Sequence, residues 1–65
     1  MEKMTLRELR KSKNLTLQQL SELSGITTTE LSFIERGKNR PRPANIRKLA
    51  TAFGLTYEEV FDMFY

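Results

Sequence analysis

Apolar side chains recur along this chain with the spacing of an α-helix. In residues 43–53, Ile46, Leu49, Ala50 and Phe53 occupy positions i, i+3, i+4 and i+7, and residues 57–64 contain a second group with that spacing. Shorter pairs give the earlier segments one apolar edge each: Leu6 with Leu9, Leu17 with Leu20, and Leu31 with Ile34. No stretch alternates between apolar and polar residues as a half-buried strand would. The pattern therefore predicts an all-α fold.

Four threonine residues mark the predicted helix starts. Each is followed three residues later by Glu or Gln, which is the capping-box pattern. In a capping box the threonine hydroxyl accepts from a helical N–H, and the longer side chain reaches back to the backbone N–H of the cap. The capping threonines are Thr5, Thr16, Thr27 and Thr56. Each is also flanked by an apolar pair at the positions of a hydrophobic staple.

Glycine residues mark the predicted helix ends. Gly25, Gly37 and Gly54 fall where a helix often ends in a left-handed residue, and Asn14 can serve in the same way after the first helix. Pro43 suits the first position of a helix, because its missing N–H would have no helical partner there. These signals predict helices at about residues 5–13, 17–24, 28–36, 43–53 and 57–64. We expect a compact bundle of five helices in one domain, residues 1–65.

The predicted helix 28–36 carries two faces. With about 100° of rotation per residue, Leu31 and Ile34 point to one side. A second stripe points to roughly the opposite side, with Thr28 beside it at the first turn; it consists of Thr29, Ser32, Phe33 and Arg36. Because the aliphatic face suffices to anchor the helix, the row of hydroxyls and one aromatic ring is a candidate contact surface. Phe33 could alternatively fold over a neighbouring side chain or fill a protein contact.

The composition excludes several classes of function. The chain has no cysteine and no histidine, so it has neither a disulfide nor the usual ligands of a zinc site. It also lacks a glycine-rich phosphate loop, and its acidic residues fall on outer helix faces or in caps, so we expect no enzyme, no cofactor and no small-molecule substrate. The apolar runs are too short for a membrane span or a signal peptide, which suggests a cytoplasmic protein.

Charge is distributed unevenly along the chain. The formal net charge is only +3, but six basic and no acidic residues lie between Arg36 and Lys48. From Gly54 to Tyr65 the charged residues are Glu58, Glu59 and Asp62. One part of the molecule should therefore attract a polyanion and another repel it, although both could also be ordinary solvated surface.

A longer stretch resembles a known DNA-binding motif. Residues 15–43 read LTLQQLSELSGITTTELSFIERGKNRPRP and are similar to the helix-turn-helix of the phage-repressor (Cro/C1, XRE-type) family. The shared features are the turn glycine, the aliphatic pair, the Glu-Arg-Gly end and the basic loop before proline. The likeness continues through the fourth and fifth helices. It implies a lambda-repressor-like DNA-binding domain in which helices 17–24 and 28–36 form the helix-turn-helix.

The resemblance gives the second helix of the motif the role of reading DNA bases. In that family this helix lies in the major groove. The match assigns base contacts to Thr28, Thr29, Ser32 and Phe33, with Arg36 at the far end. Hydroxyls can donate or accept at several bases, and threonine methyls or the ring can pack on a thymine C5-methyl. Because no Gln, Asn or Arg occupies the central positions, we expect modest discrimination, about 1 kcal/mol at the weaker contacts, with a bias toward thymine.

Contacts to phosphate are expected from helix starts and from the basic loop. Helix N-termini offer free N–H groups to phosphate oxygens, which makes the starts at Thr16 and Thr27 candidates, with Gln18 beside the first. The loop would add counterion-releasing contacts from Lys38, Asn39, Arg40 and Arg42. Alternatively, the loop is only a polar connector. Family members often carry an anchoring Gln where this chain has Leu17, so that contact passes to Gln18 or is lost.

A structural ion pair is predicted between the first and third helices. Glu35 lies at the edge of the buried face of its helix, and Arg10 has the same offset from Leu6 on the first helix. A half-buried carboxylate needs a partner, and arginine and glutamate at these positions commonly pair in the family. We therefore expect a bidentate Arg10–Glu35 bridge that orients the recognition helix.

The resemblance implies a homodimeric regulator. Its expected function is sequence-specific binding of double-stranded DNA as a transcriptional repressor, acting on a near-palindromic operator in a prokaryotic or phage setting. The last helix supplies the candidate interface: Phe61, Met63, Phe64 and Tyr65. Phe61 and Phe64 could instead close the core, which we favour for Phe61, whereas Met63 and Tyr65 are the stronger candidates for a partner contact. Two other functions stay open: a protein-interaction module, such as an antitoxin or an adaptor, and the N-terminal DNA-binding module of a longer regulator.

Overall fold

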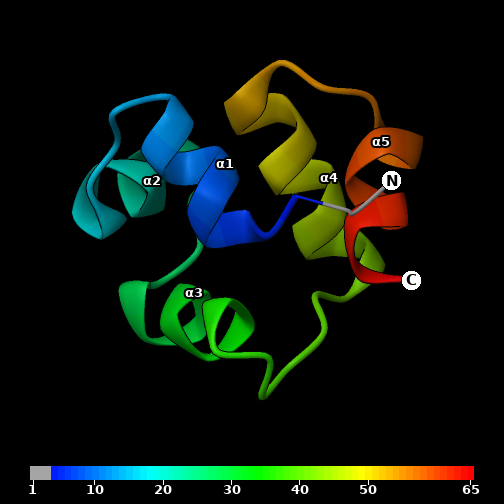
Figure 1. Ribbon diagram of the computed structural model, residues 1–65, viewed down its shortest axis with the longest axis horizontal. Coiled ribbons are helices and arrows are strands. Elements are labelled where there is room, and N and C mark those ends of the chain that lie inside the picture. Colours follow the sequence, from blue (N-terminus) through cyan, green and yellow to red (C-terminus); the bar gives the residue numbers. More distant parts are fainter. Residues whose placement is uncertain (1–3) are drawn as a thin grey trace.

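The computed structural model describes residues 4–65, and within them the chain forms five α-helices and no strand (Figure 1). The helices are α1 (Leu6–Ser12), α2 (Leu17–Ser24), α3 (Thr28–Glu35), α4 (Pro43–Phe53) and α5 (Tyr57–Phe64). The predicted all-α fold and the order of its elements are confirmed. The first and third helices are slightly shorter than expected, because Thr5, Lys13 and Arg36 are caps rather than helical residues.

The helix starts follow the threonine signals, with one exception. At Thr5, Thr16 and Thr56 both bonds of the capping box are present. At Thr27 only half of the box forms: the hydroxyl accepts from the Glu30 N–H at 3.2 Å, but the carboxylate of Glu30 does not return to the cap. The expectation of a complete fourth box is therefore wrong, and the reason lies in the tertiary structure, since Glu30 faces the basic loop.

The helix ends also follow the sequence signals. Gly25 ends α2 at φ 77° and Gly54 ends α4 at φ 69°, both in the left-handed region. Asn14 adopts φ 58° directly after the α1 cap, so it plays the same part without being glycine. The left-handed residue at Gly25 turns the chain sharply between α2 and α3, which sets the geometry of the motif.

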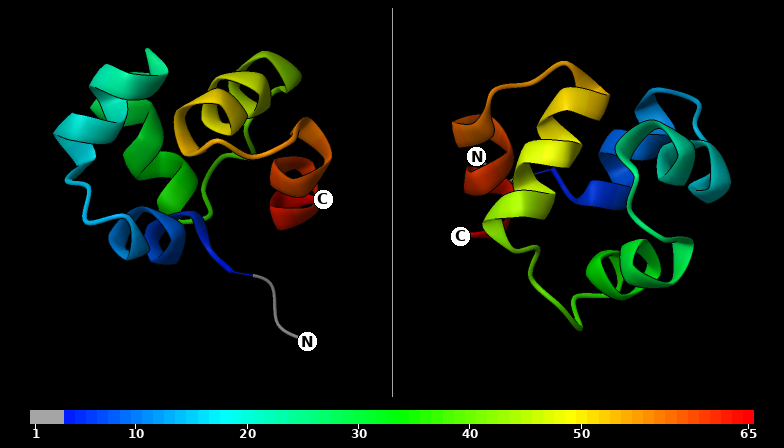
Figure 2. Two further views of the ribbon diagram at one scale, coloured as in Figure 1. Left: turned by 90° about the horizontal axis from the view of Figure 1, so that it is seen from above. Right: turned by 180° about the vertical axis from the view of Figure 1, so that it is seen from behind.

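A single hydrophobic core draws on all five helices. Its buried members are Leu6, Leu9, Leu20, Ile26, Leu31, Ile34, Ile46, Leu49, Ala50, Phe53 and Val60. Helix α3 packs against α1 and α2, while α4 packs against α2 and α5. As a result α3 and the loop after it lie along one edge of the molecule, seen from the front in Figure 1 and from behind in Figure 2.

The aromatic residues of α5 do not all enter this core. Phe64 and Met63 pack partly against it, but Phe61 is 39% exposed, so the interpretation that Phe61 closes the core is wrong. Phe61 instead stacks between Tyr57 and Tyr65, with ring centroids at 6.1 and 4.7 Å. Val60 fills the core position of this turn. In residues 4–65, no helix has the length and apolar character that crossing a membrane would require.

Candidate nucleic-acid interface

Helix α3 is held from one side and open on the other. Leu31 and Ile34 are buried in the core, whereas Thr29 and Arg36 are exposed and Phe33 is 36% exposed. Thr28 and Ser32 are half-buried beside them. The two faces are those expected from the spacing of apolar residues, so the hydroxyl-and-ring stripe is available to a ligand.

The open stripe lines a shallow depression of about 340 Å³ between α2 and α3. Its lining residues are Leu17, Thr28, Thr29, Ser32, Phe33 and Arg36. The structure therefore gathers all five predicted base-contact residues around one feature. It also adds Leu17, the first residue of α2, which sequence reasoning treated only as a lost phosphate anchor.

Arg36 folds back over its own helix. Its Nη2 donates to the Ser32 hydroxyl at 3.0 Å, and its guanidinium carbon lies 6.0 Å from the centroid of the Phe33 ring. A cation over an aromatic face is attracted by the ring quadrupole. These two contacts hold Arg36 over the C-terminal end of the depression.

An ion pair between α1 and α3 fixes the position of α3. Arg10 Nε donates to Glu35 Oε2 at 2.7 Å and Arg10 Nη2 donates to Glu35 Oε1 at 3.2 Å, which is the bidentate arrangement that the sequence predicts. Both side chains are about nine-tenths buried, at 11% and 10% exposure. Hydrogen bonding to Glu35 raises the pKa of Arg10 above its usual value, and partial burial opposes that effect. The guanidinium also donates from Nη1 to the Leu15 carbonyl at 2.8 Å.

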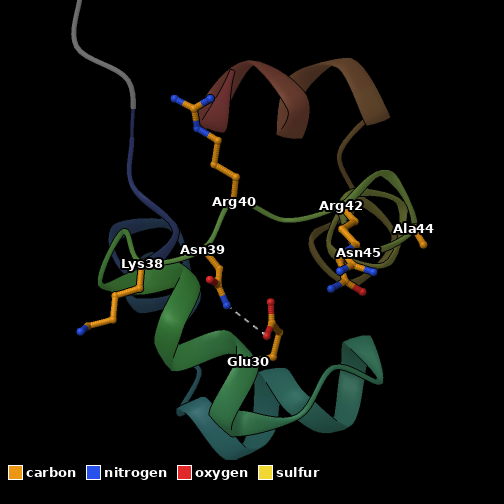
Figure 3. Close-up of a pocket in the computed structure, with 7 residues that line it drawn as sticks. All are labelled: Glu30, Lys38, Asn39, Arg40, Arg42, Ala44 and Asn45. Carbon is orange, nitrogen blue, oxygen red and sulfur yellow. Dashed lines mark hydrogen bonds between the residues drawn. The ribbon is translucent and has the colours of Figure 1, made fainter.

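The basic loop borders a second and larger depression, of about 730 Å³. It is lined by Glu30, Lys38, Asn39, Arg40, Arg42, Ala44 and Asn45 (Figure 3). The loop turns back on α3 directly, because the N–H groups of Lys38 and Asn39 both donate to the Phe33 carbonyl, at 2.9 and 3.4 Å. Across this depression Asn39 Nδ2 donates to Glu30 Oε1 at 3.5 Å, the contact drawn in Figure 3. These bonds tie the basic loop to the helix that carries the stripe.

The predicted phosphate-binding residues do not all point the same way. Figure 3 shows Lys38 and Arg40 directed away from one another, with Arg40 extending toward α5. The Arg40 guanidinium lies 5.2 Å from the centroid of the Tyr65 ring, and the Tyr65 hydroxyl donates to the Pro41 carbonyl at 2.9 Å. The end of α5 is thereby linked to the middle of the basic loop, a link that the sequence did not reveal.

The two helix starts near the stripe are engaged in capping. The hydroxyls of Thr16 and Thr27 accept from the N–H groups of Gln19 and Glu30, at 3.0 and 3.2 Å. Gln18 is exposed on the first turn of α2. The other N–H groups of each first turn have no partner within the helix, so an anion could accept from them.

Several lining residues, Glu30 and Ala44 of the loop depression among them, were not predicted from the sequence. Leu17 joins the stripe depression, Asn45 joins the loop depression, and Arg7 of α1 lines a third hollow of about 310 Å³ with Ser32 and Arg36. The start signal at Pro43 could have indicated Asn45, because a side chain on the first turn of α4 must lie beside the preceding loop. Arg7 had no such signal, since its proximity depends on the packing of α1 against α3.

Comparison with known proteins identifies the motif. The model of a helix-turn-helix family, HTH_3, matches residues 6–60, which include all of α1 to α4 and the first half of α5. The chain belongs to the HTH_3 helix-turn-helix family. In the terms of that family, α2 and α3 are the two helices of the motif, and α3 is the helix with the open stripe.

Relatives of this HTH_3 chain are transcriptional regulators by name. The uncharacterized HTH-type transcriptional regulator RghRB of Bacillus subtilis (strain 168) is 46% identical over 56 residues, which are 85% of this chain and 40% of RghRB. The HTH-type transcriptional repressor RghR of the same organism is 46% identical over 54 residues, covering 82% of this chain and 40% of RghR. The HTH-type transcriptional regulator PuuR of Escherichia coli (strain K12) is 36% identical over 57 residues, which are 88% of this chain and 31% of PuuR.

The fold agrees with that of a solved HTH_3 protein. The crystal structure of an HTH_3 family transcriptional regulator from Vibrio cholerae superposes with a TM-score of 0.78 at 33% sequence identity. The match covers 88% of this chain and 32% of that one. The chain thus spans two-fifths or less of the length of these four relatives.

Proposed function

We propose that this chain binds double-stranded DNA as part of a transcriptional regulator, with α3 in the major groove. The observation that carries the proposal is that α3 is buried on one side and open on the other. Leu31 and Ile34 anchor the helix, the Arg10–Glu35 pair fixes its orientation, and Thr29 and Phe33 stay accessible. A rigid helix with an accessible polar and aromatic stripe suits base readout, because an α-helix fits the width of the major groove.

The basic loop supports the DNA assignment over a protein-docking role. Lys38 and Arg42 lie on a loop that is hydrogen-bonded to α3, so their charges would flank whatever α3 contacts. Phosphate contacts of this kind set affinity and register without reading sequence. The starts of α2 and α3 at Thr16 and Thr27, together with Gln18 and Asn39, would complete the backbone contacts.

A dimeric repressor is the finer form of the proposal. The name of RghR supports repression, and the exposed rings of Phe61 and Tyr65 support α5 as the pairing surface, with Met63 and Phe64 packed behind them. Two copies related by a two-fold axis would present α3 to half-sites about 34 Å apart on a near-palindromic operator. Such a regulator would act in the cytoplasm, on the nucleoid.

Fluorescence anisotropy with labelled random duplex over a salt series tests the DNA assignment. We expect log Kd to change linearly and steeply with log salt concentration, because each neutralised phosphate releases counterions. A flat response would reject DNA binding and favour a protein-interaction module. Selection from random DNA would then show whether the recovered site is palindromic, which tests sequence-specific readout and pairing together.

Sedimentation with and without a selected site tests the dimer. We expect Phe61→Gln to weaken self-association and cooperative binding to a full site, while leaving binding to a half-site unchanged. Glu58→Gln, a neighbouring exposed position on the same helix, is the matched control. Equal association of the two variants would reject α5 as the pairing surface.

A further inference from the structure

The depression beside α3 has an apolar wall that the proposed function does not account for. Leu17 is the first residue of α2, half-buried, and packed partly against the core. It faces the same hollow as Phe33, Thr28 and Thr29, at the point where α2 and α3 approach each other. A leucine side chain cannot hydrogen-bond to a phosphate, but in the lining of this hollow it supplies an apolar side.

The hollow combines apolar and hydroxyl groups, with one cation at its end. Leu17 and Phe33 supply hydrocarbon, and the hydroxyls of Thr28, Thr29 and Ser32 can donate or accept. Arg36 lies at the far end, hydrogen-bonded to Ser32. The hollow therefore suits a ligand group that presents a small apolar substituent next to a hydrogen-bond acceptor.

Arg36 in the lining and the basic loop beside α3 favour a polyanion as the occupant. The N–H groups of Lys38 and Asn39 donate to the Phe33 carbonyl, so the start of the basic loop lies beside the helix that lines the hollow. In the major groove of DNA, thymine alone among the four unmodified bases presents a methyl group, at C5, and its O4 acceptor lies beside it. Cytosine presents an amino donor and no methyl at the same place.

We propose that the hollow between Leu17 and Phe33 receives the C5-methyl group of thymine, and that Leu17 is a specificity-determining residue. This inference rests on the proposed function. Leu17 and Phe33 cover the methyl, and the hydroxyl of Thr28 or Thr29 donates to thymine O4. The ring of Phe33 keeps its place because Arg36 lies over it.

Methyl removal from the DNA tests the proposal without altering the protein. A site obtained by selection is resynthesised with deoxyuridine in place of each thymidine in turn. At one position in each half-site we expect Kd to rise about three- to fourfold, which corresponds to losing the burial of one methyl group. Replacing that thymine by 5-methylcytosine should restore part of the apolar contact, whereas cytosine should not.

Two leucine variants then connect the effect to the hollow. In Leu17→Ala the ratio of Kd values for uracil and thymine should fall toward one, because the methyl loses one wall. Leu23→Ala is the matched control: Leu23 lies on the same helix, is 58% exposed, and does not line the hollow. For Leu23→Ala, the ratio of the Kd values for uracil and thymine should equal that of the unaltered protein. Because each ratio compares two DNAs on one variant, any loss of folding stability cancels.

The outcomes separate the two proposals. Steep salt dependence and a selected site, with a uracil-to-thymine ratio near one at every position, would overturn the methyl pocket alone. A threefold ratio of the Kd values for uracil and thymine that stays unchanged in Leu17→Ala would also overturn it, because Leu17 would then not contact the methyl group. Absence of salt-dependent duplex binding would overturn the proposed function itself.

Discussion

Arg10 of α1 and Glu35 of α3 are joined by two N–H···O bonds of 2.7 and 3.2 Å, with both side chains about nine-tenths buried. The same guanidinium donates to the Leu15 carbonyl just before α2. One side chain therefore ties together α1, the approach to α2 and the end of α3. Since α3 has only eight residues, its orientation depends on such contacts more than on its own helical stability.

Removing one partner of this pair should be costly. Arg10→Met would leave the Glu35 carboxylate buried without its partner, and we expect a loss of about 3 kcal/mol in the free energy of unfolding. Urea denaturation followed by circular dichroism measures it. Arg7→Met, one turn earlier and exposed, is the control and should change stability by less than about 0.5 kcal/mol. A loss below about 0.5 kcal/mol for Arg10→Met would mean that water reaches the pair freely.

The basic loop should contribute to DNA affinity unequally along its length. Lys38→Ala should lower the slope of log Kd against log salt by about one, because one phosphate contact is lost. Arg40→Ala should lower it less, because the Arg40 guanidinium lies over the Tyr65 ring rather than beside Lys38. Anisotropy titrations over a salt series measure the slope for each variant, with Lys48→Ala on α4 as the control. Equal slopes for Lys38→Ala and Arg40→Ala would show that Arg40 leaves Tyr65 when DNA binds.

Local patterns in the sequence are sufficient to predict most of the fold. A capping box or a left-handed glycine depends on residues within four positions of one another, so the starts at Thr5, Thr16 and Thr56 and the end at Gly25 follow directly from the sequence. The two faces of α3 follow from helical periodicity in the same way. The open stripe of α3 is therefore predictable from short-range spacing alone.

Features that depend on packing between helices are not predictable in the same way. Glu30 fits a capping box by spacing, but its carboxylate is directed to the loop, where Asn39 Nδ2 donates to it at 3.5 Å, and not back to the Thr27 N–H. Phe61 lies on the same apolar arc as Val60, yet only one of them fits the core, and Phe61 finds Tyr57 and Tyr65 as stacking partners instead. Periodicity predicts which side of a helix faces the core, but it does not decide which of two neighbouring side chains on that side enters the core.

Base preference should depend on the stripe of α3. Thr29→Ala and Phe33→Ala should each change the relative affinity for sites that differ at one base pair, by about 1 kcal/mol or roughly fivefold, because a base-edge contact is lost. Competition binding against a panel of single-base variants of the selected site measures the change. Thr51→Ala, which removes an exposed hydroxyl on α4, is the matched control and should leave the preferences intact. A uniform loss of affinity across the panel would reassign these residues to backbone contacts.

The capping box at the start of α5 should make the stability of the fold depend on pH. Glu59 Oε1 accepts from the Thr56 N–H at 2.9 Å, and this bond lowers the pKa of Glu59 below its ordinary value of 4.5. Because the pKa is lower in the folded state, the stabilisation is present above about pH 4.5 and is lost as the pH falls through the folded value. Glu59→Gln keeps the geometry without the titration, since Gln19 already makes the same bond to Thr16 at 2.8 Å. In thermal unfolding between about pH 6 and pH 3, the advantage of Glu59 over Gln should therefore shrink on acidification. The exposed Glu58→Gln variant is the control, and an advantage of Glu59 that stays constant over this range would contradict the linkage between its ionisation and the cap of α5.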